Sequence, residues 1–309
     1  MCEISIVLLN YKNPELTANC VNSILQAKPK MPYEIIIIDN HSEDGSVEFL
    51  KGKFPEITIK DSGRNGGFAF GNNAGVRMAT GKYLLLLNND TEIMDGMIES
   101  LYEYSEKHKE IGMLGCRALD GNGVELPVMH SFETLHRILL QTYVKPFLEK
   151  LHLQRKLVSI NEGRKMNSEE FISAQWISGS AMFIRKELYC ELGGLDENFF
   201  MYMEDEDLSR RVKMAGNTVG VINKVGYTHF CGGSTINSYF LTKEYIKSRL
   251  VFFMRYDPKH FSWIKKALYA QIAVVNTELD KYQIQKMKCE LEQFVHDDLK
   301  RKAERVMKI

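Results

Sequence analysis

Four consecutive carboxylates form the densest group of side chains that could do acid–base chemistry. They run from Glu204 through Asp205 to Asp207 and are followed by Arg210 and Arg211. Neighbouring carboxylates raise one another's pKa, and a raised pKa suits a general base. The same pattern is typical of the acidic first turn of a helix, with i,i+4 ion pairs further along. The residues alone leave both interpretations open.

A second polar group could bind a divalent cation. Asn88, Asn89 and Asp90 follow four leucines, so a carboxylate stands at the end of a predicted buried strand. Mg²⁺ prefers oxygen ligands and uses one or two protein carboxylates beside phosphate oxygens. Capping of the next turn by Asp90 is the alternative. His229, in the sequence THFCGGS, could ligate a metal or contact phosphate, although a lone histidine is more often structural.

Glycines and asparagines alternate with aromatic residues over 65–73, NGGFAFGNN. Gly66 and Gly67 would let the backbone approach a ligand, and a helix that begins near Gly67 would offer free N–H groups to phosphate. The spacing differs from G-x-G-x-x-G, which argues against a dinucleotide site. A glycine turn with asparagine caps is the alternative, but we favour ligand binding. The asparagines of this stretch are Asn65, Asn72 and Asn73.

These groups need a scaffold, and the pattern of the first 115 residues predicts one. Apolar runs predict buried strands at 4–9, 33–38 and 83–87, with a weaker strand at 57–60. Segments with helical spacing alternate with them. This order predicts an α/β fold, Rossmann-like, with a mostly parallel central sheet flanked by helices.

Polar residues stand at three of the predicted strand ends, where such sheets bind ligands. They are Asn10–Tyr11, Asp39–Asn40 and 88–90, and together they indicate one crevice. Asp39 could accept a hydrogen bond from a nucleobase or a ribose hydroxyl. A helix cap or turn is the alternative for Asp39.

The second half of the chain is less clearly patterned. Residues 121–171 indicate only a helix around 135–151, order returns at 176–185, a short strand is indicated at 218–222, and the chain looks helical after 243. Trp176, near Gly179, could stack on a sugar ring, although a buried tryptophan is the alternative.

Composition narrows the class of protein. The 309 residues carry 40 basic and 40 acidic side chains, a balance that argues against a nucleic-acid binder. No apolar run approaches the roughly 18 residues of a membrane span, and the apolar stretch at 4–9 is too short for a signal peptide. Six scattered cysteines predict reduced thiols in a cytoplasmic chain.

Taken together, these motifs resemble the family-2 glycosyltransferases, which have the GT-A fold. The resemblance covers about residues 3–240 and rests on the opening strand to Asn10–Tyr11, IIIIDNHSEDGS (35–46), LLLLNNDTE (84–92) and the stretch at 193–211. RNGGFAFGNNAGV (64–76) is similar to the bacterial rhamnosyltransferase branch, which commonly uses dTDP-rhamnose.

The resemblance implies roles for individual residues. Asp39 would contact the nucleobase, and Asp90 would bind Mg²⁺ or Mn²⁺ on the donor diphosphate, with His229 completing that site. Asn88 departs from the family pattern, because many relatives have aspartate there, and this leaves fewer carboxylates for the metal. Asp205 would be the general base, with Glu204 as the fallback. The further residues implied for donor binding are Asn10, Tyr11, Asn65, Gly66, Gly67, Asn72, Asn73 and Asn89.

The implied reaction is a single displacement that inverts the sugar's anomeric centre. The donor is a nucleotide sugar and the acceptor a glycan or lipid-linked glycan. A UDP-hexose donor is the alternative within the fold, and a catalytically silent scaffold that binds sugar nucleotides is the alternative from another class. We predict a GT-A domain at 1–241, with a nucleotide-sugar part (1–115) and an acceptor and catalytic part (116–241).

The remaining segment, 242–309, is predicted to be a helical basic extension. It carries 15 Lys and Arg against 9 Asp and Glu, with aromatic residues among them. Such helices can lie on anionic lipid, which would put the enzyme on the inner face of the cell membrane. Packing on the catalytic domain or formation of a homodimer are the alternatives.

Overall fold

The computed structural model describes residues 2–145, 170–230, 238–276 and 279–306. The chain divides into two compact units, which are treated separately below. Unit 1 comprises Met1–Phe132 and Glu162–Thr235, and unit 2 comprises Glu133–Asn161 and Ile236–Ile309. The division of the chain by function into 1–241 and 242–309 stays a prediction.

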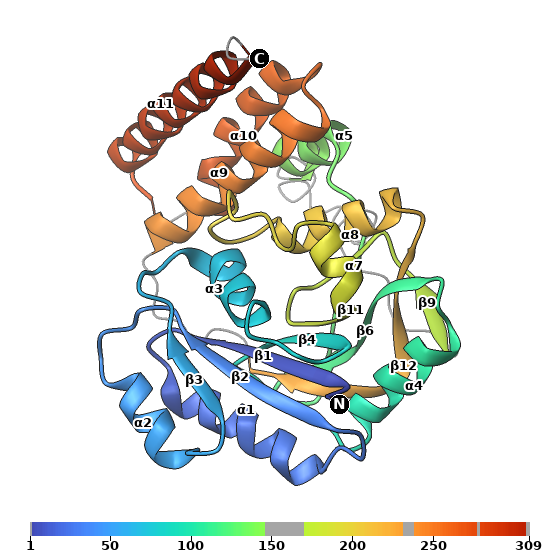
Figure 1. Cartoon of the computed structure of the whole chain (residues 1–309). Coiled ribbons are helices and arrows are strands. Elements are labelled where there is room, and N and C mark those ends of the chain that lie inside the picture. The colour runs from blue at the N-terminus through green and yellow to red at the C-terminus, as the bar shows by residue number, and fades with distance from the viewer. Residues whose placement is uncertain (1, 146–169, 231–237, 277–278, 307–309) are drawn as a thin grey trace. The chain divides into compact units, whose positions relative to one another are not determined.

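Unit 1 is built on one mixed sheet with the strand order β3-β2-β1-β4-β11-β6-β12-β5, and β7 and β9 pair at its side (Figure 1). β1 lies parallel to both β2 and β4, as the alternation of strands and helices predicted. β11 runs antiparallel to β4 and β6. A separate two-stranded sheet joins β8 and β10. The strands are β1 Ile4–Asn10, β2 Tyr33–Asp39, β3 Thr58–Asp61, β4 Tyr83–Asn88, β5 Thr91–Ile93, β6 Ile111–Leu119, β7 Glu125–Leu126, β8 Met129–His130, β9 Phe171–Ser173, β10 Trp176–Ile177, β11 Ala181–Arg185 and β12 Thr218–His229.

Helices cover both faces of this sheet. Figure 1 draws α1 and α2 below it and α3 above it, so the central strands are buried on both sides. α3 packs directly on β1, because a side chain at Gly71 or Gly75 would collide with Leu9 or Val7. The helices of unit 1 are α1 Pro14–Ala27, α2 Ser46–Lys53, α3 Gly67–Val76, α4 Met97–Lys107, α7 Lys186–Glu191 and α8 Glu204–Met214.

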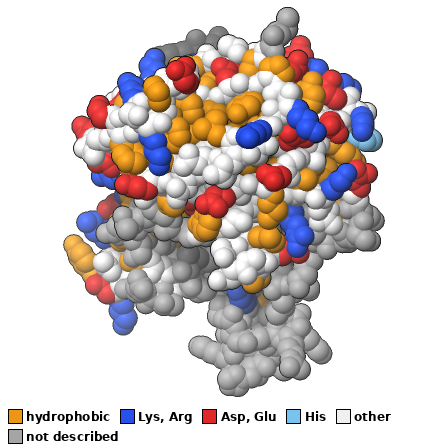
Figure 2. All heavy atoms as spheres, turned by 90° about the horizontal axis from the view of Figure 1, so that it is seen from below, with side chains coloured by type: hydrophobic (Ala, Val, Ile, Leu, Met, Phe, Trp, Pro, Cys, Tyr) orange, Lys and Arg blue, Asp and Glu red, His pale blue; other side chains and the backbone are white. Residues whose placement is uncertain are grey.

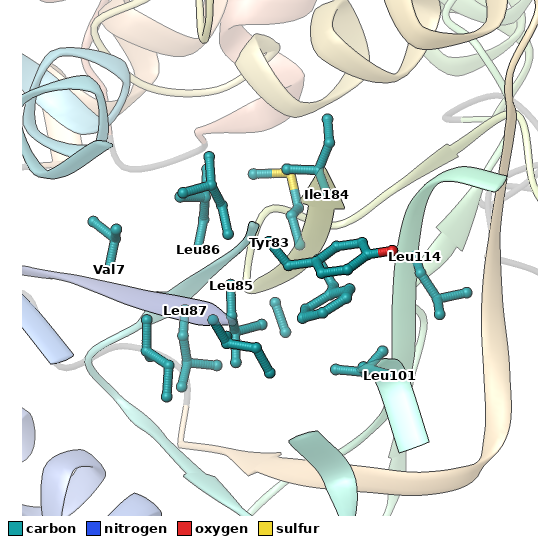
Figure 3. Packing of buried hydrophobic residues seen from close by; sticks show 14 of the residues in the cluster. Val7, Tyr83, Leu85, Leu86, Leu87, Leu101, Leu114 and Ile184 are labelled. Carbon is teal, nitrogen blue, oxygen red and sulfur yellow. The ribbon is translucent and has the colours of Figure 1, made fainter. Parts of the chain in front are cut away.

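The packing of the core explains why the sequence of β4 is an uninterrupted apolar run. Leu85 and Leu87 point to one face of the sheet while Leu86 points to the other, and all three are buried (Figure 3). Tyr83 stacks on Phe183 of the neighbouring strand with ring centroids 4.9 Å apart. Because both faces are covered, alternate side chains are all apolar. The polar residues of β4 are therefore confined to its end.

Unit 2 is helical. It contains α5 Leu135–Leu139, a π-helix Leu140–Val144, α9 Ser238–Tyr256, α10 Phe261–Val275 and α11 Lys281–Val306. The helix predicted around 135–151 is confirmed as far as residue 144, and its end lies outside the described residues. Arg249 of α9 is fully buried and binds Glu133 and Gln271. This pair joins the segment that precedes α5 to the C-terminal helices.

One face of unit 1 carries mixed charge. Figure 2 shows the side on which α1 and α2 lie, where acidic, basic and hydrophobic side chains are interspersed. Among the described residues, no helix combines the length and apolar character needed to cross a bilayer.

Candidate functional site: the carboxyl edge of the sheet in unit 1

The ends of β1, β2 and β4 meet in register. Asn10 is the strand partner of Asp39, and Leu9 is the partner of Asn88. Hydrogen bonds extend this alignment to the side chains, because the Asn10 amide donates to Asp39 over 2.6 Å. The Asn89 amide donates to Thr17 on α1 over 2.9 Å. Polar residues from three separate segments therefore lie at one edge of the sheet.

Asp39 is tightly held by its own loop. Both the backbone N–H and the hydroxyl of Ser42 donate to its carboxylate, over 2.8 and 2.7 Å, and the side chain is 1 % exposed. The next residue, Asn40, donates to Asn65 over 2.9 Å and so ties this loop to the glycine-rich stretch. Contact of Asp39 with a nucleobase stays a prediction. Tyr11 is half-buried beneath the amino group of Lys12.

Asp90 and His229 lie together although 138 residues separate them in the sequence. The Asp90 carboxylate is 3.1 Å from the His229 Nε2 atom, because β12 ends beside β5, where His229 pairs with Thr91. The Phe230 N–H also donates to the Asp90 carbonyl over 2.9 Å. A cavity of about 160 Å³ opens beside Asp90, between Leu16, Asn19, Thr91, Glu92 and Phe230.

The carboxylate and the imidazole of this pair fit a divalent cation whose remaining coordination positions are filled by a bound phosphate and water. Within the described residues, no group of three or more His, Cys, Asp or Glu side chains is placed to hold a metal. Two protein ligands are compatible with Mg²⁺, which leaves other positions to phosphate oxygens and water. The Asn88 Oδ1 atom, at the same strand end, is buried without a hydrogen-bond partner among the described residues. It is a further oxygen for such a site.

The glycine-rich stretch braces another part of the chain. Gly67 has φ +84°, and a Cβ atom there would lie 2.0 Å from the Phe200 carbonyl oxygen. The Phe68 N–H donates to the same oxygen over 2.8 Å. Further along α3, Asn73 donates to the Leu195 carbonyl over 2.8 Å. α3 thus holds the segment that leads into α8.

The remaining predicted donor-site residues of this stretch also make contacts within the protein. The Asn72 amide donates to the Phe68 carbonyl over 2.9 Å inside α3. Asn65 accepts from the Gly67 N–H over 3.2 Å, and the Gly66 N–H donates to Asn40 over 3.4 Å. Their contact with a donor stays a prediction.

α8 presents the acidic cluster from a strained start. Tyr202 and Met203, just before the helix, have φ +69° and +74°, a region that costs energy for residues with side chains. The Asp205 carboxylate then accepts the N–H groups of Gly179 and Glu206 over 2.9 and 2.8 Å. Burial raises the pKa of Asp205. A carboxylate held this way and with a raised pKa can accept a proton.

The neighbours of Asp205 divide into two kinds. Glu204 is 6 % exposed, and its Oε2 atom has no partner among the described residues. Burial, and then the charge of Asp205, raise the pKa of Glu204 well above its usual range. Asp207 instead forms an ion pair with Arg211 over 2.6 Å, and Arg211 also binds the Leu192 carbonyl. The ion pair of Asp207 fits the helix interpretation of the acidic cluster, whereas the role of Asp205 as general base stays a prediction.

One short turn joins Asp205 to the end of β4. The turn 178–180 lies between β10 and β11, and its Gly179 N–H binds Asp205 while the Ser180 carbonyl accepts from the Asn88 N–H over 2.9 Å. Trp176 precedes this turn, stacks on His130 at 4.2 Å and donates from its indole N–H to the Ser131 carbonyl. The acidic helix and the Asn88–Asp90 segment thus share one support.

The residues that the sequence analysis missed are the supports of this site: Thr17, Ser42, Ser180 and Phe200. Each acts through a hydrogen bond to a residue distant in sequence or through its backbone. Their own residue types give no signal that separates them from other serines, threonines and phenylalanines.

Comparison with known proteins identifies the class. Glycosyl transferase family 2 matches residues 5–192, and the chain belongs to this family. Membership of this family is what the motifs predicted, and the mixed, mostly parallel sheet flanked by helices confirms the predicted fold class. Glu204, Asp205 and His229 lie beyond the matched segment.

Two of the relatives that the chain resembles within this family are rhamnosyltransferases. The chain is 26% identical over 203 residues to the N-acetylglucosaminyl-diphospho-decaprenol L-rhamnosyltransferase of Mycobacterium tuberculosis. The alignment covers 62% of this chain and 64% of the relative. The chain is 25% identical over 212 residues to the rhamnosyltransferase WbbL of Escherichia coli K12, with 64% and 74% covered. The crystal structure of Staphylococcus aureus TarS shares the fold, with a TM-score of 0.53 at 14% identity over 88% of this chain and 44% of TarS.

Proposed function

We propose that the chain transfers a sugar from a nucleotide-sugar donor to a glycan or lipid-linked glycan acceptor. The observation that carries this proposal is the turn 178–180, which holds Asp205 beside the strand end that bears Asp90. dTDP-rhamnose is the donor that we favour, because two relatives named above are rhamnosyltransferases. The diphospho-decaprenol acceptor of the mycobacterial relative supports a lipid-linked acceptor here.

Asp90 and His229 would hold Mg²⁺ or Mn²⁺. Such a cation, when bound, neutralises the negative charge that develops on the leaving diphosphate. The chain's own contribution is to fix the Asp90 carboxylate and the His229 imidazole 3.1 Å apart at the sheet edge. Residues 10, 11, 39, 65–67, 72, 73 and 89 are proposed to surround the rest of the donor.

Asp205 would take the proton of the acceptor hydroxyl as that hydroxyl attacks the anomeric carbon. The two N–H groups that bind its carboxylate keep it oriented, and its raised pKa gives it affinity for the proton. Attack from the face opposite the diphosphate inverts the anomeric centre in one displacement. Glu204 is the fallback base, and Trp176 and Gly179 are proposed to lie on the acceptor side.

We propose that unit 2 makes a peripheral membrane contact on the cytoplasmic side. Trp263 on α10 is 68 % exposed, and the Lys266 amino group lies 5.4 Å from its ring centroid. An exposed tryptophan beside lysines favours the interface of an anionic bilayer. The alternative is that a second copy of the chain packs on the same surface and forms a homodimer.

Calorimetric titration of the full chain tests the donor. dTDP-rhamnose, UDP-glucose and UDP-galactose are each titrated with Mg²⁺ and with chelator. We expect metal-dependent binding of dTDP-rhamnose alone. Binding of a UDP-sugar instead would overturn the donor but keep the reaction class. Absence of binding by all three would overturn all of these donors, whereas binding without sugar transfer would favour the silent scaffold.

A further inference from the structure

A directed chain of hydrogen bonds crosses the edge of the sheet in unit 1. The Asn89 amide donates to the Thr17 hydroxyl over 2.9 Å, and the Thr17 hydroxyl donates to the Asn10 side-chain oxygen over 2.7 Å. The Asn10 amide then donates to Asp39 over 2.6 Å. The chain starts beside Asp90 and ends on the carboxylate at the end of β2. Every donor points the same way, toward the negative charge.

Three of the four members are buried. Asn10 and Thr17 are 0 % exposed and Asp39 is 1 % exposed. In such surroundings each hydrogen bond is stronger than in water and polarises the next, whereas an unpaired member is costly. The chain is therefore a stiff connection between the two ends. Backbone register aligns the strands themselves, but it does not fix how the side chains beyond their ends are turned.

Thr17 is the member that comes from a helix. Asn10 and Asp39 end strands β1 and β2 and Asn89 follows β4, while Thr17 lies in the first turn of α1. Its single hydroxyl accepts from Asn89 and donates to Asn10 over 2.7 Å, while the Asn13 carbonyl is a more distant acceptor at 3.1 Å. Removing this hydroxyl would leave an amide and a carbonyl oxygen unpaired, and would free the Asn89 side chain.

We propose that Thr17 is a positioning residue that sets the Asn88–Asp90 segment relative to Asp39, so that the nucleoside and diphosphate parts of the donor are bound as one unit. This inference rests on the proposed function, which puts the nucleoside at Asp39 and the diphosphate at Asp90. Thr17 itself touches neither part of the donor. Asp39 keeps both of its bonds from Ser42 when the Thr17 hydroxyl is absent, so the larger effect falls on the Asn89 side.

The test compares two ligands on three variants of the full chain. dTMP and dTDP are titrated with Mg²⁺ into wild type, Thr17→Val and Thr17→Ser. Valine keeps the shape of threonine but lacks the hydroxyl, whereas serine keeps the hydroxyl. Thr142→Val makes the same change at another buried threonine, in unit 2, and serves as the matched control. Thermal unfolding of each variant is recorded beside the titrations.

We expect Thr17→Val to weaken dTDP about tenfold, the effect of one buried hydrogen bond, while dTMP changes less than about threefold. Thr17→Ser and Thr142→Val should bind both ligands like wild type. An equal loss for both ligands in Thr17→Val would show a merely structural role and overturn the inference, as would unchanged binding of both. Failure of the wild type to bind either nucleotide would overturn the dTDP-linked donor of the proposed function instead.

Discussion

Replacing Gly67 with alanine would put a methyl group into the backbone contact between α3 and the segment that leads to Asp205. The new Cβ atom would lie 2.0 Å from the Phe200 carbonyl oxygen, whereas real Cβ atoms essentially never come within 3.0 Å of such an atom. One side must therefore move by about 1 Å or more. The hydrogen bond from Phe68 to that carbonyl would be lost or stretched.

A matched control separates this contact from the cost of the backbone conformation. Gly67 has φ +84° and Gly216, just after α8, has φ +82°, but a Cβ atom at Gly216 meets no described atom within 4 Å. Alanine should cost about 1 kcal/mol at either position for its positive φ. At Gly67 the lost hydrogen bond and the displacement should add about 2 kcal/mol.

Thermal unfolding and sugar transfer measure the two consequences. We expect Gly67→Ala to melt about 4–8 °C below Gly216→Ala. A displacement of about 1 Å near the base should also lower kcat by up to about 100-fold in Gly67→Ala alone. Equal melting temperatures and equal kcat in the two variants would refute the idea that α3 holds the approach to Asp205.

Three further predictions concern the carboxyl groups of Glu204 and Glu106 and the surface of unit 2. Because the folded pKa of Glu204 is raised by burial and by Asp205, the stability that this carboxyl supports is lost as pH rises, so Glu204→Gln should gain melting temperature over wild type between pH 5 and pH 8. A constant difference across that range would contradict it. Hydrogen bonds from Lys109, Lys82 and Tyr83 lower the pKa of Glu106 to about 2, so its contribution is present above pH 4.5 and lost toward pH 2. Glu106→Gln should cost about 1 kcal/mol at pH 7 in urea unfolding, allowing for solvent screening, and nothing near pH 2. Trp263→Ala should reduce the amount of protein that sediments with anionic vesicles severalfold and leave transfer to a water-soluble acceptor unchanged. Equal sedimentation of the variant and wild type would argue that a different surface binds the membrane.

The central strands could be predicted from the sequence because burial on both faces leaves a signal that local residues carry. β2 and β4 are runs of four isoleucines and four leucines that end abruptly in polar residues. The parallel order then puts these ends at one edge. The sequence therefore predicts that Asn10, Asp39 and Asp90 lie in one region.

The supports of the site could not be predicted, because they depend on pairs of residues distant in sequence. Asn73 was expected at a ligand but also holds the Leu195 carbonyl, 122 residues further on. Gly67 is predicted to let the backbone approach a ligand, which stays a prediction, and its missing side chain also makes room for the Phe200 carbonyl. A glycine pattern indicates that something comes close, and only the fold says what.

The sequence also could not distinguish the individual residues of the acidic cluster 204–207. Four carboxylates in a row are equivalent in sequence, and their environments separate them. Asp207 is neutralised by Arg211 one turn along α8, whereas Asp205 turns toward the Gly179 N–H. The assignment of Asp205 as the base came from the family resemblance, because helix periodicity alone offers no choice between neighbours.

The most direct test of the account is donor binding measured side by side for wild type, Asp90→Ala and Asp205→Asn. Each is titrated with dTDP-rhamnose in Mg²⁺ and in chelator, and its sugar transfer is measured. We predict that Asp90→Ala binds as weakly in Mg²⁺ as wild type does in chelator, while Asp205→Asn binds like wild type but transfers no sugar. Full metal-dependent binding by Asp90→Ala, or near-normal turnover by Asp205→Asn, would contradict the account.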